Sequence, residues 1–216
     1  MNLKVSAAHI YHKYMSIFKK IFGSSSNDAS NEANDNEYSP FQDLHAQLPI
    51  DEQFTHNFKK NGGKFLYCEN PTELNEQFEN ILEENDWFES ECLCLEERLF
   101  TMLEENNIVY KNSTAPKFLL ATCESLIAEE GSVMFSSNQI KQNKPHDLPI
   151  NIVVIATTSQ IVLSKSDGLR EIKKRYTTAY PTNITTIKYF EKGKEEHFLQ
   201  YGSSQKNLYL LLLEDL

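Results

Sequence analysis

Apolar residues follow two alternating patterns between positions 51 and 213. Helices are expected where apolar side chains return every three or four positions, as Leu74, Phe78 and Ile81 do after Pro71. Strands are expected at short, β-branched apolar runs, of which residues 152–156 are the strongest. The expected helices cover residues 51–60, 71–85, 96–105 and 167–176, and residues 123–129 form a short helix or turn. The expected strands cover residues 64–68, 91–95, 108–110, 117–121, 132–135, 152–156, 161–163 and 208–213, with residues 184–190 and 197–201 as a possible hairpin.

The order of these elements predicts an α/β fold. Strands alternate with helices through the first half, which is typical of β-α-β units and a largely parallel central sheet covered on both faces. The second half has closely spaced strands and fewer helices, so we expect some antiparallel pairing there. Parallel sheets bind ligands outside the carboxyl ends of their strands. We therefore expect a ligand-binding site to involve polar residues in the loops after Cys68, Leu95, Ala121 and Ala156.

Residues 1–49 show a different pattern from the rest of the chain. Residues 1–22 form an amphipathic leader, and residues 23–49 form a polar linker that we expect to be disordered. The leader could bind a protein partner or a membrane surface, but its few basic residues favour a loosely held tail. Met15 is a second candidate for the start of the chain. Residues 50–216 then form one domain.

Composition excludes several classes of protein. The net charge is −10, from 31 acidic and 21 basic residues, which argues against a nucleic-acid partner because phosphate contacts need a basic surface. No apolar run reaches the ~18 residues of a membrane span, and no secretory signal opens the chain, so we expect a cytoplasmic protein without an integral membrane segment. The four cysteines form no C-x-x-C pair and are expected to be free thiols, so the sequence predicts no metal site and no cofactor.

Several segments, in order, resemble the LUD (lactate-utilisation) family. Residues 128–132 (AEEGS) are similar to its central A-E-T-G-T segment, residues 148–155 (LPINIVVI) to L-P-x-x-H-I-x-V-V, and residues 159–162 (SQIV) to its x-x-I-V turn and strand. Residues 200–204 (QYGSS) precede the last apolar strand where the family has G-x-H-G-P, and residues 61–65 (NGGKF) look like its first strand. The resemblance covers residues 50–216. It implies a three-layer α/β fold related to the NagB/RpiA/CoA-transferase group.

The same resemblance implies a link to lactate utilisation, because members similar to the lactate-utilisation protein C are linked to oxidation of L-lactate. This chain departs from the family at several polar positions. No G-P-S turn or D-I-E segment occurs near residues 181–188. Asn151 stands where a His is usual, Glu130 replaces a Thr, and residues 201–203 (YGS) replace His-Gly-Pro. Catalytic roles tied to those groups are therefore not transferred to this chain.

Glu129 is the main candidate for a catalytic residue. It occupies the acidic position of the family segment, directly after an apolar stretch, where a carboxylate could act as a base, a nucleophile or a hydrogen-bond acceptor. The alternative is a solvated turn that carries two exposed glutamates.

Polar residues near three expected strands are candidates for ligand binding. Glycine permits close approach of backbone N–H groups to an anion, and hydroxyl groups add donors, although the same residue types also dominate ordinary turns. The candidates are Gly131, Ser132, Ser136, Ser137, Asn138, Thr158, Gly202, Ser203 and Lys206.

Three functions remain open from the sequence. The first is an accessory protein that binds a small organic acid or a phosphorylated metabolite. The second is an enzyme of organic-acid metabolism that uses Glu129, of the acyl- or CoA-transfer type. The third is an interaction module whose leader and acidic surface contact a protein partner. No Ser-His-Asp set, G-x-S-x-G segment or Walker loop is present, and the missing family segment favours the first or third function over the second.

Overall fold

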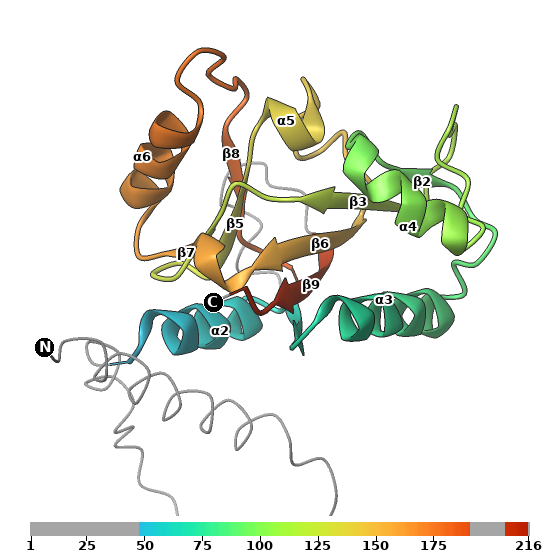
Figure 1. Ribbon diagram of the computed structural model, residues 1–216, viewed down its shortest axis with the longest axis horizontal. Coiled ribbons are helices and arrows are strands. Elements are labelled where there is room, and N and C mark those ends of the chain that lie inside the picture. The colour runs from blue at the N-terminus through green and yellow to red at the C-terminus, as the bar shows by residue number, and fades with distance from the viewer. Residues whose placement is uncertain (1–47, 191–205, 216) are drawn as a thin grey trace, which may run out of the picture. The chain divides into compact units, whose positions relative to one another are not determined.

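Two β-sheets form the centre of the computed structural model, which describes residues 48–190 and 206–215 (Figure 1). The larger sheet has five strands, and every pairing within it is parallel. Its strand order is β1 (Lys64–Cys68), β9 (Asn207–Leu213), β6 (Asn151–Thr157), β3 (Phe118–Thr122) and β2 (Cys92–Leu93). This arrangement confirms the expected α/β class with a largely parallel central sheet.

The second sheet has four strands and contains the antiparallel pairing expected for the second half of the chain. β4 (Ser125–Ile127) pairs antiparallel with β5 (Ser132–Phe135), and β5 pairs antiparallel with β8 (Thr185–Ile187). β7 (Ile161–Val162) lies parallel to β4 at the other edge. Since β4 follows β3 after only two residues, the chain passes directly from the larger sheet into the smaller one.

The longer helices carry capping residues at their starts or basic residues at their ends. In α3 (Pro71–Asn85), the side chain of Asn70 accepts a hydrogen bond from the Glu73 backbone N–H, and Pro71 occupies the first turn. The helices α2 (Ile50–Lys60) and α6 (Lys165–Arg175) both end in basic residues, which suit the negative end of the helix dipole. The shorter helical segments are η1 (Glu97–Leu99), α4 (Phe100–Glu105), α5 (Ser137–Ile140) and η2 (Thr158–Gln160).

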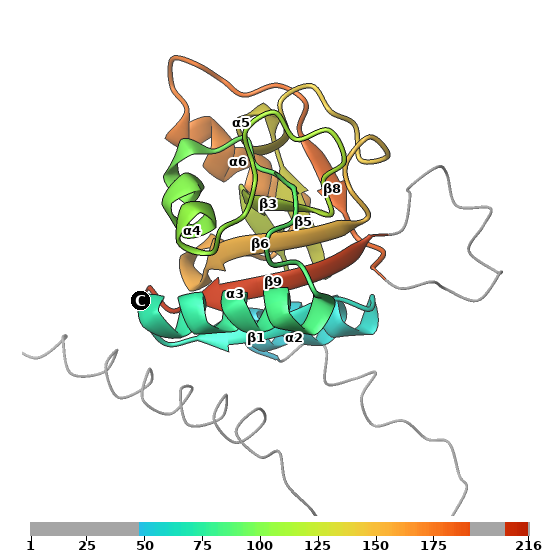
Figure 2. The same ribbon diagram turned by 90° about the vertical axis from the view of Figure 1, so that its right-hand side faces the viewer.

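The larger sheet is buried on both faces, which explains why its strands are almost continuously apolar (Figure 2). One face, with Phe118 and Leu211, packs against the helices α3 and α4. The opposite face, with Leu119 and Leu210, packs against α2 and the smaller sheet. The far side of the smaller sheet is covered by α6, through Ile172.

The sequence was wrong about two segments and missed a third. Residues 123–129 were expected to form a helix or turn, but they contain β4, because a short, wholly buried apolar run has no distinguishing period. Residues 108–110 were expected to be a strand, but only one bridge forms, between Val109 and Glu91. The four-residue helix α5 was not predicted, although Ser136 and Gln139 form a capping box at its start. The proposed partner of β8 at 197–201 lies outside the described residues.

Among the helices of residues 48–190 and 206–215, none combines the length and the apolar composition needed to cross a lipid bilayer.

Candidate functional site

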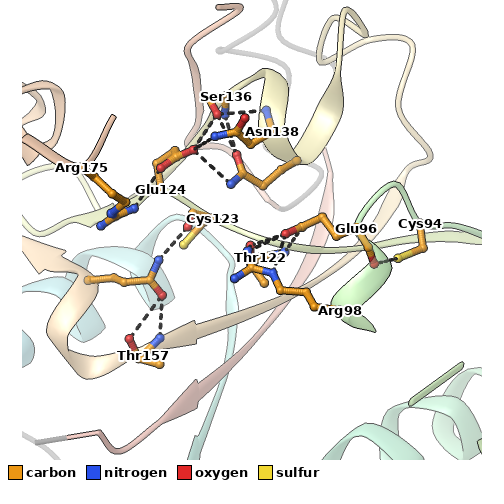
Figure 3. A network of polar contacts seen from close by, with 12 residues as sticks. Cys94, Glu96, Arg98, Thr122, Cys123, Glu124, Ser136, Asn138, Thr157 and Arg175 are labelled. Carbon is orange, nitrogen blue, oxygen red and sulfur yellow. Dashed lines mark hydrogen bonds and ion pairs between the residues drawn. The ribbon is translucent and has the colours of Figure 1, made fainter. Parts of the chain in front are cut away.

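Polar side chains gather at the carboxyl edge of the larger sheet (Figure 3). Parallel strands all end at the same edge, so the residues that follow β2, β3 and β6 come together there. Glu96 follows β2, Thr122 and Glu124 lie at the end of β3, and Gln160 follows β6. These are three of the four loops that the strand pattern indicated.

Glu96 is a buried carboxylate, with 8% of its surface exposed. It accepts hydrogen bonds from the backbone N–H of Thr122 at 2.7 Å and from the Thr122 hydroxyl at 2.8 Å. Arg98 donates to the same carboxylate from Nε at 3.0 Å and from a terminal nitrogen at 2.6 Å. This two-pronged contact fixes the plane of the guanidinium group, and Arg98 also donates to the Thr122 hydroxyl.

Glu124 is more enclosed, with no exposed surface, and its carboxylate binds the short helix α5. Its Oε1 accepts from the Ser136 hydroxyl at 2.6 Å, from Gln139 Nε2 at 3.1 Å and from Asn138 Nδ2 at 3.2 Å. A carboxylate without access to water needs such a set of donors, because burying a charge is costly unless it is hydrogen-bonded. The capping residues of α5 therefore also satisfy Glu124.

The end of α6 supplies the positive charge for Glu124. Arg175 donates from Nη1 to Oε2 at 3.0 Å, and the Tyr176 hydroxyl lies 3.3 Å from both carboxylate oxygens. The side chain of Arg175 is 44% exposed, whereas that of Glu124 is completely buried. Arg175 thus contacts a buried carboxylate while part of its own side chain stays exposed to solvent.

Cys123 lies between the two glutamate–arginine pairs (Figure 3). Its carbonyl accepts from Gln160 Nε2 at 2.6 Å, and Gln160 in turn accepts from the backbone N–H of Thr157, so the end of β6 is attached to the end of β3. Burial, followed by the charges of Glu124 and Glu96, raises the pKa of the Cys123 thiol, while Arg175 and Arg98 act in the opposite direction. The Cys123 side chain is 2% exposed and packs within the hydrophobic core.

The two arginines are the groups at this edge that can contact a ligand. The Arg98 side chain is 65% exposed, and Arg175 is 44% exposed. Arg98 uses Nε and one terminal nitrogen, and Arg175 uses one terminal nitrogen, so the remaining N–H groups have no partner among residues 48–190 and 206–215. Guanidinium N–H groups that remain free can donate to carboxylates and phosphates.

Thr158 lies farther along the same edge and contacts Asp215, which follows β9. The Thr158 hydroxyl donates to Asp215 at 2.8 Å, and Ser159 donates from its backbone N–H at 2.9 Å and from its hydroxyl at 2.6 Å. Burial acts to raise the pKa of Asp215, but the hydrogen bonds from Ser159 and Thr158 together outweigh it, so the pKa lies below its ordinary value.

Glu129 does not join this network. It lies in the turn between β4 and β5, and it is exposed, so an inward-facing carboxylate is not found at this position. Its neighbour Glu130 forms an ion pair with Lys165 at 2.9 Å. The catalytic role of Glu129 stays a prediction, made from the family segment alone.

Gly131 follows in the same turn, and it permits close backbone approach, as expected, but to a helix. Its φ is +58°, and a Cβ atom here would lie 2.2 Å from the carbonyl carbon of Asn57 in α2. The side chain of Asn57 donates to the Ala128 carbonyl at 2.8 Å, and that of Asn61 donates to the Glu130 carbonyl at 2.7 Å. The space that an anion would need at Gly131 is therefore occupied by α2.

The other predicted ligand-binding residues are divided among several places. Ser136 and Asn138 reach the carboxyl-edge network through Glu124. Ser132 is buried beside Glu130, with its hydroxyl 3.4 Å from that carboxylate. Ser137 accepts from the Thr182 backbone N–H at 3.0 Å. Gly202 and Ser203 lie outside the described residues.

Lys206 lies at the opposite edge of the sheet, where β9 begins. It is 2% exposed, and its Nζ donates to the Leu148 carbonyl at 2.7 Å. Burial lowers the pKa of its amino group, and the charge of Asp147 acts against that shift. The structure thus separates Lys206 from Thr158, Ser136 and Asn138.

Sequence reasoning missed Glu96, Arg98, Glu124 and Arg175. Signals were available for three of them: Glu96 directly follows the expected strand at 91–95, Arg98 lies three residues after it, and Glu124 lies three residues after the expected strand at 117–121. Arg175 gave no such signal, because it is one of three consecutive basic residues that end α6. Within the part of the chain that the structure describes, no group of three or more histidine, cysteine or acidic side chains is arranged to hold a metal ion.

Comparison with known proteins agrees with this architecture. No curated protein matches the chain. The fold is similar to the crystal structure of a DUF162 family protein from Deinococcus radiodurans, with a TM-score of 0.54 and 13% sequence identity, over 79% of this chain and 98% of that chain. At this identity the likeness concerns the fold alone. The LUD domain family model matches residues 86–213, which include β2, β3, β6 and the whole smaller sheet. The chain therefore belongs to the LUD domain family.

Proposed function

We propose that this protein binds a small organic anion, either an organic acid or a phosphorylated metabolite, at the carboxyl edge of its parallel sheet. The observation that carries the proposal is the pair of half-exposed guanidinium groups, each fixed by a buried carboxylate. Arg98 is held by Glu96, and Arg175 is held by Glu124. A guanidinium that is already ordered loses less conformational entropy when it binds a ligand, which favours affinity.

Charge around the site supports the same ligand class. Each glutamate–arginine pair is neutral overall, so the outward N–H groups would act mainly as oriented hydrogen-bond donors. The last turn of α6 adds the exposed Lys173 next to Arg175, whereas Lys174 forms an ion pair with Glu171. In a chain of net charge −10, a local basic surface of this kind would attract small anions toward the edge.

The arrangement favours a binding or accessory role over catalysis. Glu124 is completely enclosed by donors, and the Cys123 thiol is buried, so neither has the access that a nucleophile requires. We therefore place the protein as a cytoplasmic accessory of organic-acid metabolism, in keeping with the lactate-utilisation association of its family. An acyl- or CoA-transfer enzyme that uses Glu129 is the alternative, and the exposure of that side chain is the observation in its favour. A protein partner for the leader remains a prediction about residues outside the described ones.

The test is a calorimetric titration with L-lactate, pyruvate and inorganic phosphate. We expect at least one of these to bind the wild-type protein, and Arg98→Lys and Arg175→Lys each to weaken binding about tenfold. Lysine keeps the charge, but it lacks the further N–H groups with which arginine can contact its glutamate and a ligand at once. Arg170→Lys is the matched control, since Arg170 also lies on α6 but pairs with Asp167.

Two outcomes would contradict the proposal. One is binding that Arg98→Lys and Arg175→Lys leave unchanged while Glu129→Gln abolishes it, which would support the alternative site. The other is no binding of any of the three anions. Unfolding curves for every variant show whether a loss of binding merely reflects a loss of structure.

A further inference from the structure

The two arginines are anchored to almost the same point of the chain. Arg98 donates to the hydroxyl of Thr122, and Arg175 donates to the carboxylate of Glu124, two residues later. Arg98 comes from the segment after β2, whereas Arg175 comes from the end of α6. Two unrelated segments thus bring guanidinium groups to one strand end.

The spacing of these anchors is short. Two residues of fully extended chain span at most about 7 Å between Cα atoms. Figure 3 shows Arg98 and Arg175 on opposite sides of Cys123, the residue between the two anchors.

Each guanidinium group retains donors for one acidic group. Each arginine contacts a buried carboxylate, while its side chain as a whole is 65% exposed at Arg98 and 44% exposed at Arg175. A single carboxylate that binds the free N–H groups of one arginine leaves the second arginine unused. A molecule with two acidic groups separated by a few bonds would engage both.

We infer that the natural ligand of this edge carries two anionic groups, as a short dicarboxylate or a phosphorylated carboxylic acid does. This inference rests on the proposed function and narrows its ligand class. Joining two weak contacts in one molecule makes the second contact intramolecular, and the gain is greatest when the linker length matches the distance between the sites. The ligand would then lie across residues 122–124, between Arg98 and Arg175.

The experiment is a titration of the full-length protein with malonate, succinate, glutarate and adipate, each compared with the monocarboxylate of equal length. We expect one diacid to bind about tenfold or more tightly than its monocarboxylate, with weaker binding of both shorter and longer diacids. Phosphoglycolate, which replaces one carboxylate by a phosphate group, tells whether that second group is better as a phosphate. In Arg98→Lys and in Arg175→Lys, the preference for the diacid should fall to about twofold or less.

Equal binding of monocarboxylates and diacids by the wild-type protein, with both arginine variants still weakening it, would overturn this inference and leave the proposed function standing. A diacid preference that survives both lysine substitutions would also overturn it. If no mono- or dianionic probe binds at all, both the inference and the proposed function fall.

Discussion

The carboxyl-edge network and the β4–β5 turn each contain two glutamates, but the two pairs differ in burial and in their hydrogen-bonding partners. Glu96 and Glu124 are buried and surrounded by donors, whereas Glu129 is exposed and Glu130 pairs with a surface lysine. The turn is the part that resembles the family segment most closely. Its glycine and the two asparagines of α2 show that this segment joins a hairpin to a helix. A recognisable motif thus marks a packing contact, while the polar network lies a few residues away.

The largest expected loss of stability comes from a substitution in the β4–β5 turn. Gly131→Ala should destabilise the fold by about 3 kcal/mol or more, because it combines left-handed backbone with a collision against the backbone of Asn57. Gly62→Ala is the control, since Gly62 also has a positive φ, of 85°, and should cost only about 1 kcal/mol. Urea unfolding measures both. A small effect at Gly131 would mean that the turn can move away from α2.

A smaller effect is expected from neutralising the buried carboxylate. Glu124→Gln should reduce stability by about 2–3 kcal/mol, because it leaves the partly buried Arg175 without its charge partner and disturbs the donors from α5. Glu129→Gln should change stability by less than about 0.5 kcal/mol, as surface substitutions do. The two variants carry the same chemical change, so equal unfolding free energies would remove the distinction between the two regions.

The smallest expected effect is the pH-dependent contribution of Asp215 to the stability of the fold. The pKa of Asp215 is lowered in the folded state by hydrogen bonds from Ser159 and Thr158, so it stabilises the fold above its unfolded pKa of about 3.9. That contribution is lost as the pH falls through the lower folded value. Because Asp215 is exposed, it should amount to only a few tenths of a kcal/mol.

Asp215→Asn should therefore lower stability slightly at pH 6 and match the wild type near pH 2. The exposed Glu97→Gln is the control, with no expected difference at either pH. A wild-type advantage that grows as the pH falls would contradict the assignment of those hydrogen bonds.

The sequence predicted most of the fold, because burial on both faces of the larger sheet leaves a strong apolar signal. The bounds of β1, α3 and β5 agree with their expected ranges. β4 was missed because three buried residues between two turns have no period of their own. The α5 helix was missed because it is held by its cap and by Glu124 more than by apolar spacing.

The sequence indicated the loops that contain the candidate site and two of its residues, Ser136 and Asn138, but not the two glutamate–arginine pairs. The rule that ligands bind beyond strand carboxyl ends indicated the loops after Leu95, Ala121 and Ala156, and these loops contain the network. What the sequence lacks is the pairing of Arg175 with Glu124, which are 51 residues apart and meet only after α6 packs on the smaller sheet. Glu129 had the stronger motif, yet burial distinguishes the two carboxylates, and burial follows from tertiary structure.

The most direct test of an anion site at the carboxyl edge is a titration of the ¹⁵N-labelled protein with succinate, followed by amide chemical shifts. The largest changes are expected at residues 96–98, 122–124 and 175–176, together with the side-chain Nε–H signals of Arg98 and Arg175. Changes centred on residues 129–132, with residues 122–124 unmoved, would contradict this expectation.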